Sequence, residues 1–437
     1  KDILGIFSPF LIWGRSQEVN TKTNTYDVIV IGGGASGMMA AGRAAELGKK
    51  VLLLEKNLKL GEKLKISGGG RCNITNAEED IHKLLKNYGE ASQFLYSSFS
   101  QFGNKDSFAF FEKLNLPLVV QARKRAFPHT EKAFDVFYSL ENYMKNGSVK
   151  GGVKVMTKTK VSRILKEGKC ITGIVADSHT YTAKSYILAT GGLSHPETGS
   201  TGDGFNWLKA LSHSVITPTP TIVPISTKES WSHELSGTSL SFMKISFFVD
   251  GVKKFSKTGK ILFTHFCLSG PLILNMAKAI SDLLHEGIVT ARIDAYPHTN
   301  EGALEVKIIN IFDKNKNKII KNVIDEIAPE GMGVALLSLV KSIEFDTKVH
   351  SITKEQRKLL VNTLKSLPLT VTGLMGYDRA VVADGGIPLT EINTKTMKSK
   401  VLENLFITGD LLHINRPSGG FSLQLCWTTG FVAGTNA

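Results

Sequence analysis

The stretch that decides the fold runs from residue 26 to residue 56: YDVIVIGGGASGMMAAGRAAELGKKVLLLEK. An apolar run at its start is typical of a buried parallel strand. Gly32, Gly34 and Gly37 follow in G-x-G-x-x-G spacing, and a second apolar run ends at Glu55. The glycines permit a tight turn, bring the backbone close to a pyrophosphate and let helix and strand pack closely, while the terminal acid can bind a ribose. We therefore predict a dinucleotide-binding βαβ unit with the pyrophosphate at the helix N-terminus.

The composition is typical of a soluble globular enzyme. A length of 437 residues suggests two or three domains, and 42% hydrophobic residues are sufficient for sizeable cores. No apolar stretch reaches the ~18 residues that a membrane span needs. The four cysteines lie far apart, without C-x-x-C or metal-ligand spacing. We therefore expect a cytoplasmic protein with no disulfide framework, no transmembrane segment and no metal.

The net charge of +14 raises the question of a nucleic-acid partner. The lysines are scattered along the chain, however, and few aromatic residues lie among them. We therefore interpret the charge as a lysine-rich solvated surface, and we expect a small-molecule substrate instead of nucleic acid.

Two further glycine-rich stretches have backbone that a ligand could approach closely, because few side chains cover it. In SGGGRCN (residues 67–73), three glycines precede Arg71, which favours a ligand-facing loop over a flexible surface turn. Cys72 is interpreted as a small packed residue and not as a redox group, because no partner cysteine is near it in the sequence. In YILATGG (residues 186–192), an apolar strand ends in small residues at the top of a sheet.

The C-terminal stretch NLFITGDLLHINRPSGGFSLQLCWTTGFVAG completes this pattern. A strand is followed by Gly409 and by Asp410, whose carboxylate we expect in the same crevice as Glu55. The helix predicted over residues 421–433 begins after two glycines, and its N-terminal N–H groups would favour the negative charge of a reduced flavin. We therefore predict flavin contact here, rather than a final strand and helix without a cofactor.

The middle of the chain has a different pattern. Residues 78–145 are expected to be mostly helical. Beyond them, Pro218, Pro220 and Pro224 interrupt the chain and β-type runs follow, which indicates an antiparallel sheet or small barrel ahead of a lysine-rich helical part. There is no second G-x-G-x-x-G to mark a nicotinamide domain. We predict an extension outside the fold (1–25), a cofactor domain in two parts (26–205 and 371–437) and an insert domain between them (206–370).

Several motifs together resemble those of the bacterial NAD(P)/FAD-dependent oxidoreductases of the BaiN/RdsA type, which include aminoacetone-oxidase-like members. These motifs are KISGGGRCNITN, FPHTEKA, ILATGGLSHPETGSTGDG, KILFTHFCLSGP, ADGGIPLTEINTKTMKSK and the terminal GD…GGF segment. The resemblance covers nearly all of residues 26–437. It implies an α/β fold: a Rossmann-type FAD-binding domain, similar to that of glutathione reductase, interrupted by an insert domain with a β-barrel part and a helical part.

The resemblance also implies the residues that contact FAD. Glu55 would bind the adenosine ribose, Asp410 the ribityl oxygens, and the backbone of Val161 the adenine. The full set of implied contacts is Gly32, Gly34, Ala35, Ser36, Gly37, Glu55, Lys56, Gly70, Arg71, Cys72, Asn73, Val161, Ala189, Thr190, Gly191, Gly409, Asp410, Gly420, Phe421, Ser422 and Leu423.

The chain departs from the family pattern at three positions. His195, Cys267 and Asp384 stand where a Tyr, a Gly and a small residue are common. Cys267 would alter the choice of substrate if it faced the active site.

The expected chemistry is hydride transfer through flavin N5 in a reductase or dehydrogenase of a small organic molecule, with NAD(P)H as the candidate electron donor. His265 and Ser269 are weak catalytic candidates, because an imidazole with a pKa of about 6.5 suits proton exchange. Two alternatives stay open: an FAD-dependent, aminoacetone-like amine oxidase that uses oxygen, and a flavin-dependent protein that binds or modifies RNA. The oligomeric state is left open.

Overall fold

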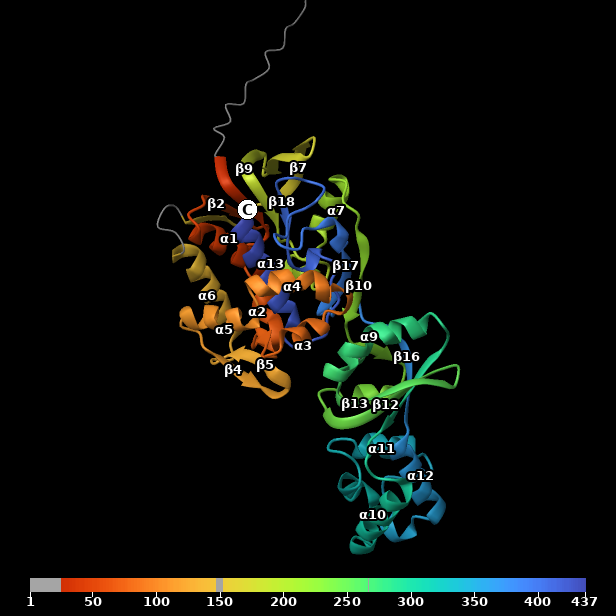
Figure 1. The fold of residues 1–437 in the computed structure, drawn as a ribbon. Helices are drawn as coiled ribbons and strands as arrows, with labels where there is room; N and C mark the ends of the chain where they lie inside the picture. The colour runs from red at the N-terminus through yellow and green to blue at the C-terminus, as the bar shows by residue number, and fades with distance from the viewer. Residues whose placement is uncertain (1–24, 147–151, 266) are drawn as a thin grey trace, which may run out of the picture.

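We describe the fold from a computed structural model, which covers residues 25–146, 152–265 and 267–437. Apart from Thr25, the extension predicted at 1–25 lies outside these described residues. Figure 1 shows a larger α/β lobe that contains both the first (red) and the last (blue) segments, and a barrel with a helical part that extends away from it. The predicted architecture, a Rossmann-type domain with an inserted barrel, is confirmed. Among the described residues, no helix combines the length and the apolar character that crossing a membrane would require.

The larger lobe is built on a parallel sheet with the strand order β6-β2-β1-β9-β18. Its apolar strands are largely buried on both faces, as expected for parallel strands between helices. The last residues of β9 belong to this sheet, where Ile187 lies opposite Val30 and Phe406. The first residues of β9 pair with an antiparallel hairpin of β7 and β8. The bounds are β1 (Thr25–Ile31), β2 (Val51–Leu54), β6 (Val153–Met156), β7 (Val161–Glu167), β8 (Cys170–Ala176), β9 (His179–Leu188) and β18 (Leu405–Ile407).

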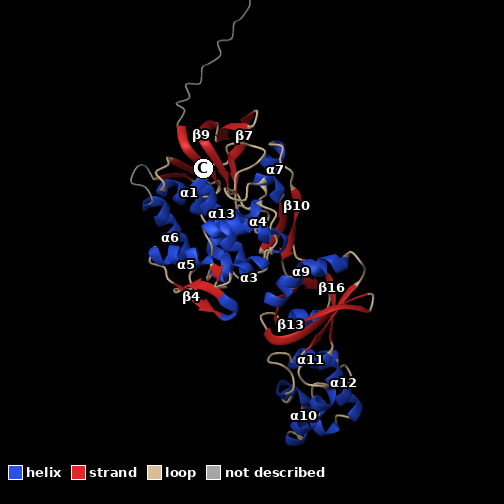
Figure 2. Cartoon of the chain, in the orientation of Figure 1, coloured by secondary structure: helices blue, strands red, loops and turns tan. Residues whose placement is uncertain are grey.

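Two helices from opposite ends of the chain pack against each other: α1 (Ala35–Glu46) and α13 (Phe421–Asn436). A Cβ added at Gly430 would come within 2.4 Å of the Ser36 carbonyl oxygen, and Gly434 is equally close to the backbone of α1. These glycines therefore let the two helix backbones approach closely. The packing joins the C-terminal segment to the N-terminal βαβ unit in one core, and Figure 2 shows α1 and α13 next to each other.

Residues 78–145 are mostly helical, as predicted, but residues 118–128 contain two short strands that sequence reasoning did not identify. There β4 (Leu118–Gln121) and β5 (Arg125–Pro128) form an antiparallel sheet with β3 (Thr75–Asn76). Adjacent β-branched valines in β4 favour a strand, and pairing within this sheet supplies the backbone hydrogen bonds that a helix would otherwise make. The helices of this region are α3 (Ile81–Lys86), α4 (Ser92–Gln101), α5 (Asn104–Lys113) and α6 (Ala133–Asn146).

The insert contains a closed antiparallel barrel of six strands, in the order β11-β14-β13-β12-β15-β16. Buried aromatic side chains such as Phe247 and Phe263 fill its core. Helix α9 packs on the barrel, and helices α10 to α12 lie at the end remote from the larger lobe (Figure 1). The bounds are β11 (Ile225–Thr227), β12 (Ser239–Val249), β13 (Val252–Phe263), β14 (Cys267–Ser269), β15 (Val289–Asp294), β16 (Leu367–Leu374), α9 (Pro271–Leu284), α10 (Glu301–Lys314), α11 (Gly333–Leu339) and α12 (Lys354–Lys365).

Two paired strands, β10 (Ile216–Ile222) and β17 (Val382–Gly386), connect the lobes. Pro218 and Pro220 lie inside β10, and the pairing of β10 with β17 shifts its register around each of them. β10 tolerates residues without an N–H group because β17 is its one neighbour in this two-stranded sheet.

The predicted domain boundaries fall inside regular elements. Helix α7 (Asp203–Ala210) packs into the core of the larger lobe through Phe205 and Leu208, whereas Leu367 and Leu369 of β16 belong to the core of the insert. A boundary after residue 205 would divide α7, and a boundary after residue 370 would divide β16. We therefore propose to place the division within the connecting strands β10 and β17.

Candidate active site

A cavity of ≈ 1020 Å³ opens at the carboxyl ends of the parallel strands in the larger lobe. Residues that follow β1, β2, β9 and β18 line it. Helix α9 of the insert also reaches the cavity, through Leu274 and Asn275. Ligands of open α/β sheets bind at this edge of the sheet, so the cavity is the candidate active site.

The N-terminus of α1 points its free backbone groups at this cavity. Gly34, Ala35 and Ser36 line the cavity. Among the described residues, no side chain caps the helix, and its first turn carries no acidic residue. A Cβ added at Gly34 would meet no atom within 4 Å, so the backbone is open to a ligand. Uncapped N–H groups with the positive end of a helix dipole behind them are suited to bind a phosphate.

The N-terminus of α13 lies on the same cavity. Phe421, Ser422 and Leu423 line it, and no described side chain caps this helix either. The preceding Gly420 has φ +101°, and a Cβ there would come within 2.3 Å of the backbone of Thr75, so the position requires glycine. Two positive helix ends therefore converge on one cavity, one from each end of the chain.

Glu55 holds the glycine loop of the first βαβ unit. Its Oε2 accepts a hydrogen bond from the backbone N–H of Gly33 at 2.7 Å, and its Oε1 accepts one from that of Asn57 at 2.8 Å. The residue is 8% exposed and lines the cavity. Lys56 and Val161 line a smaller adjoining cavity, which Glu55 also borders.

Asp410 belongs to a partly buried polar cluster that sequence reasoning did not predict. Its carboxylate pairs with the Arg416 guanidinium and lies 3.9 Å from the Lys63 Nζ atom. Burial alone would raise the pKa of Asp410, but Arg416 and Lys63 outweigh burial and hold it below its usual value, so the carboxylate stays charged. Burial lowers the pKa of Lys63, although Asp410 opposes this shift. Burial, with Asp410 adding to it, raises the pKa of the Cys426 thiol to about 12, so this cavity-lining sulfur stays protonated.

Most of the predicted cofactor contacts lie on the cavity. The residues that line it are Gly32, Gly34, Ala35, Ser36, Glu55, Arg71, Asn73, Ala189, Thr190, Gly191, Asp410, Gly420, Phe421, Ser422 and Leu423.

Four predicted contacts line neither of these two cavities: Gly37, Gly70, Cys72 and Gly409. Gly37 packs α1 against the preceding loop, since a Cβ there would come within 1.9 Å of the Gly32 carbonyl oxygen. Cys72 is fully buried, and burial raises the pKa of its thiol to about 12, as expected of a packed residue.

The two weak catalytic candidates do not reach the cavity. His265 precedes β14 and Ser269 ends it, and neither lines the cavity. The residues that do so come just after them, at the start of α9, where Pro271 and Leu274 face the opening. The side chain of Cys267 lies outside the described part of the structure.

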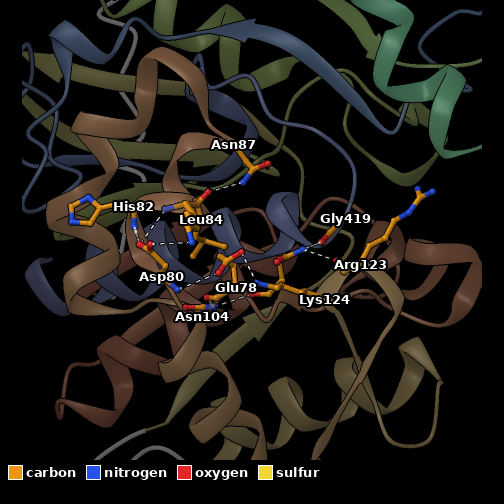
Figure 3. Close-up of polar contacts among 11 residues, drawn as sticks. Glu78, Asp80, His82, Leu84, Asn87, Asn104, Arg123, Lys124 and Gly419 are labelled. Atoms are coloured by element: carbon orange, nitrogen blue, oxygen red, sulfur yellow. Dashed lines mark hydrogen bonds and ion pairs between the residues drawn. The ribbon is translucent and has the colours of Figure 1, made fainter. Parts of the chain in front are cut away.

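The rim of the cavity near α13 carries a basic loop between β4 and β5. Arg123, Lys124 and Arg125 line the cavity, with Arg71 close by. Figure 3 shows the polar network that holds this rim, in which Lys124 pairs with Glu78 at 2.7 Å. This loop has no recognisable dinucleotide motif, so only its three consecutive basic residues could have signalled it in the sequence.

The groups on the cavity fit a dinucleotide cofactor with a negatively charged pyrophosphate and many hydroxyls. The N-termini of α1 and α13, which no described side chain caps, supply donors, and Asp410 supplies a charged acceptor. Among the described residues, no group of three or more His, Cys, Asp or Glu side chains is placed to hold a metal ion.

Comparison with known sequences identifies a family and two similar proteins. The family described as "HI0933-like protein Rossmann domain" matches residues 26–436. A 3-dehydro-bile acid delta(4,6)-reductase of Clostridium scindens is 27% identical over 411 residues, 93% of this chain and 98% of the relative. A ribosomal RNA dihydrouridine synthase of Haemophilus influenzae is 27% identical over 414 residues, 92% of this chain and 96% of the relative.

Solved structures share the fold at low sequence identity. A flavocytochrome c3 fumarate reductase in an open conformation aligns with a TM-score of 0.53 and 16% identity, over 95% of this chain and 78% of its own. A 3-ketosteroid-delta4-(5alpha)-dehydrogenase from Rhodococcus jostii RHA1 aligns with a TM-score of 0.51 and 14% identity, over 97% of this chain and 98% of its own. At this identity the likeness supports the fold alone.

Proposed function

The chain belongs to the HI0933-like family and is an FAD-dependent oxidoreductase; from this premise we propose that it reduces a carbon–carbon double bond conjugated to a carbonyl group, with NAD(P)H as electron donor. When bound, FAD supplies hydride transfer through its N5 atom. The observation that carries the proposal is that α1 and α13, whose N-termini no described side chain caps, converge with the charged Asp410 on one cavity.

The chain's own groups divide the work of cofactor binding. The N–H groups of Ala35 and Ser36 bind the pyrophosphate, and Glu55 accepts hydrogen bonds from the adenosine ribose. Asp410 accepts hydrogen bonds from ribityl hydroxyls, because its low pKa keeps it a carboxylate at neutral pH. The N–H groups at the start of α13 stabilise negative charge on the flavin ring edge and thereby favour the reduced state.

The two curated relatives support the substrate class. The Clostridium scindens enzyme is named for reduction of delta(4,6) double bonds in a 3-dehydro-bile acid. The Haemophilus influenzae enzyme is named for making dihydrouridine, which is uridine with a reduced ring double bond conjugated to a carbonyl. In both substrates the carbonyl draws electron density, so the carbon at the far end of the double bond can accept hydride.

Helix α9 of the insert lines the cavity beside the start of α13. The Asn275 Oδ1 atom of α9 accepts hydrogen bonds from the backbone N–H and the hydroxyl of Ser418, at 3.0 and 2.8 Å. Ser418 lies just before α13, so this contact seats the insert beside the flavin end of the cavity. Exclusion of water there would protect the hydride from side reactions.

The test starts with the visible spectrum of the purified protein and its FAD content. NADH or NADPH is then added without air, followed by a 3-oxo-4,6-dienoic bile acid or a uridine-containing RNA. We expect loss of flavin absorbance with one of the two donors and its recovery with one of the two acceptors. Flavin that stays oxidised with both donors, but forms hydrogen peroxide from aminoacetone in air, would support an amine oxidase instead.

A further inference from the structure

The rim of the cavity carries more positive than negative charge. Four basic residues lie there, Arg71, Arg123, Lys124 and Arg125. Two of them are neutralised, since Arg71 pairs with Glu131 at 2.8 Å and Lys124 pairs with Glu78 at 2.7 Å. Neither Arg123 nor Arg125 forms an ion pair with a carboxylate of the described residues. The Arg125 Nε atom donates to a backbone carbonyl at 3.1 Å, which leaves the Arg123 guanidinium as the less engaged of the two.

The backbone of Arg123 is held rigidly in a conformation that side chains disfavour. Arg123 and Lys124 have φ of +61° and +57°, in the left-handed region. The Asn76 side chain donates to the Arg123 carbonyl at 3.3 Å, and the backbone N–H of Ala77 donates to the Lys124 carbonyl at 2.7 Å. A strained loop that its neighbours fix in place is typical of a functional site, because the strain persists only where the surroundings impose it.

The network behind this loop directs the Arg123 side chain outward. The Asn104 side chain donates to the carbonyls of Asn76 and Glu78, and Glu78 in turn pairs with Lys124. Figure 3 shows the side chain of Lys124 turned toward this network and that of Arg123 extending away from it. The ion pair of Lys124 therefore holds the loop in place, while the Arg123 side chain extends away from the network toward a possible ligand.

The position of Arg123 distinguishes it from the cofactor-binding groups. The Asn76 side chain that holds the Arg123 carbonyl also donates to the Gly419 carbonyl at 3.1 Å, next to the start of α13. Glu55 and the N-terminus of α1 follow β2 and β1 of the parallel sheet, and in the proposed function they hold the adenosine ribose and the pyrophosphate. Arg123 is therefore placed at the flavin end, beside the contact between Asn275 and Ser418, and remains available for a second ligand.

We propose that Arg123 is a specificity-determining residue that anchors an oxyanion of the substrate, a carboxylate or a phosphate, at the mouth of the cavity. The proposal rests on the proposed function, because it assumes a reducible substrate in this cavity. A guanidinium presents paired N–H donors that match the two oxygens of either group, which an ammonium cannot do. The anchored substrate would extend from the rim toward the start of α13.

The test measures binding to the oxidised, FAD-loaded protein through changes in its visible spectrum at low salt. Two matched pairs of probes are titrated: cholate with its methyl ester, and a uridine hexanucleotide with uridine. The variants are Arg123→Gln, Arg123→Lys and, as control, Arg163→Gln, which removes the same charge from an exposed position on β7 that lines neither cavity.

We expect the anionic member of one pair to bind more tightly than its neutral partner. Arg123→Gln should weaken that binding about tenfold or more, Arg123→Lys less, and Arg163→Gln not measurably. Binding of the neutral partner should not change. A response to cholate identifies a carboxylate as the anchored group, and a response to the hexanucleotide identifies a phosphate.

Three results would overturn the proposal. The first is that neither anion binds more tightly than its neutral partner. The second is that Arg123→Gln binds both anions as the wild type does. The third is that Arg123→Gln slows anaerobic reduction by NADPH while anion binding is unchanged, which would assign Arg123 to binding of the electron donor. Failure of the proposed function would look different, because the protein would then carry no FAD or its flavin would not be reduced by either nucleotide.

Discussion

The two ends of the cavity offer different groups to a ligand: backbone groups at one end and charged side chains at the other. At the α1 end, backbone N–H groups and glycines from one continuous stretch form the ligand site, and Glu55 holds the loop through hydrogen bonds to the backbone. At the rim, charged side chains of residues 123–125 line the cavity, as does helix α9 of the insert. Backbone cradles suit a cofactor that never changes, whereas side chains can vary with the substrate. Substitutions at one end should therefore leave ligand binding at the other end intact.

Replacement of Gly37 by alanine should disrupt the ligand site at the N-terminus of α1. The new Cβ would lie 1.9 Å from the Gly32 carbonyl oxygen, so the loop must move. We expect a loss of about 4 kcal/mol in the free energy of unfolding and little bound FAD, measured by denaturant titration and flavin absorbance. Gly34→Ala is the matched control: its φ is −83° and its Cβ meets no atom, so stability should hold while FAD affinity falls. Normal FAD binding by both variants would contradict a backbone cradle.

Replacement of Asp410 by asparagine should have the next largest effect. It leaves Arg416, whose side chain is 2% exposed, without its charged partner. We expect a loss of about 3 kcal/mol in the free energy of unfolding of the FAD-free protein, and weaker FAD binding in addition.

The pH dependence of this effect has a defined sign. The pKa of Asp410 is lowered in the folded state, so its contribution is fully present above its ordinary value of 3.8 and is lost as the pH falls through the folded pKa. The difference in stability between wild type and Asp410→Asn should therefore be constant from about pH 5 to 8 and shrink below about pH 4. A difference that changes across neutral pH would mean that another group titrates with this pair.

Replacement of Asn275 by alanine should affect the rim and spare the cofactor end. It removes the acceptor for both hydrogen bonds from Ser418 and loosens the seat of the insert. We expect KM for the substrate to rise about fivefold, with the dissociation constant of FAD unchanged. Ser418→Ala removes one of the two donors and should give a smaller effect. An equal change in FAD affinity would show that the two ends are not independent.

Replacement of Lys124 by glutamine should have the smallest effect. Lys124 pairs with Glu78 on the solvent-exposed rim, and such pairs contribute little to stability because water screens them. Anion binding should weaken less than in Arg123→Gln, although the two residues are adjacent and carry the same charge. Equal losses in both variants would indicate a diffuse field of positive charge instead of a placed guanidinium.

The two ends of the cavity also differ in how much of their structure could be predicted from the sequence. The glycine loop, Glu55, and the strand and helix that carry Asp410 and Phe421 could all be predicted, because each lies in a local pattern whose spacing has a backbone cause. The roles of Lys63 and Arg416 could not, because they meet Asp410 only after distant segments pack together. The strands β4 and β5 were also missed, because their pairing with β3 is not a local property.

By itself, the sequence determined the βαβ unit, the glycines that a bound dinucleotide requires, and the presence of an inserted β-rich region. These follow from interactions among residues close in the chain, such as hydrophobic periodicity and the conformational freedom of glycine. Three features depend on the tertiary structure: α1 and α13 open on one cavity, α9 reaches it, and Arg123 lies at its rim without an ion pair to any described carboxylate. Those features are distances between remote segments, and the packing of the whole chain sets such distances.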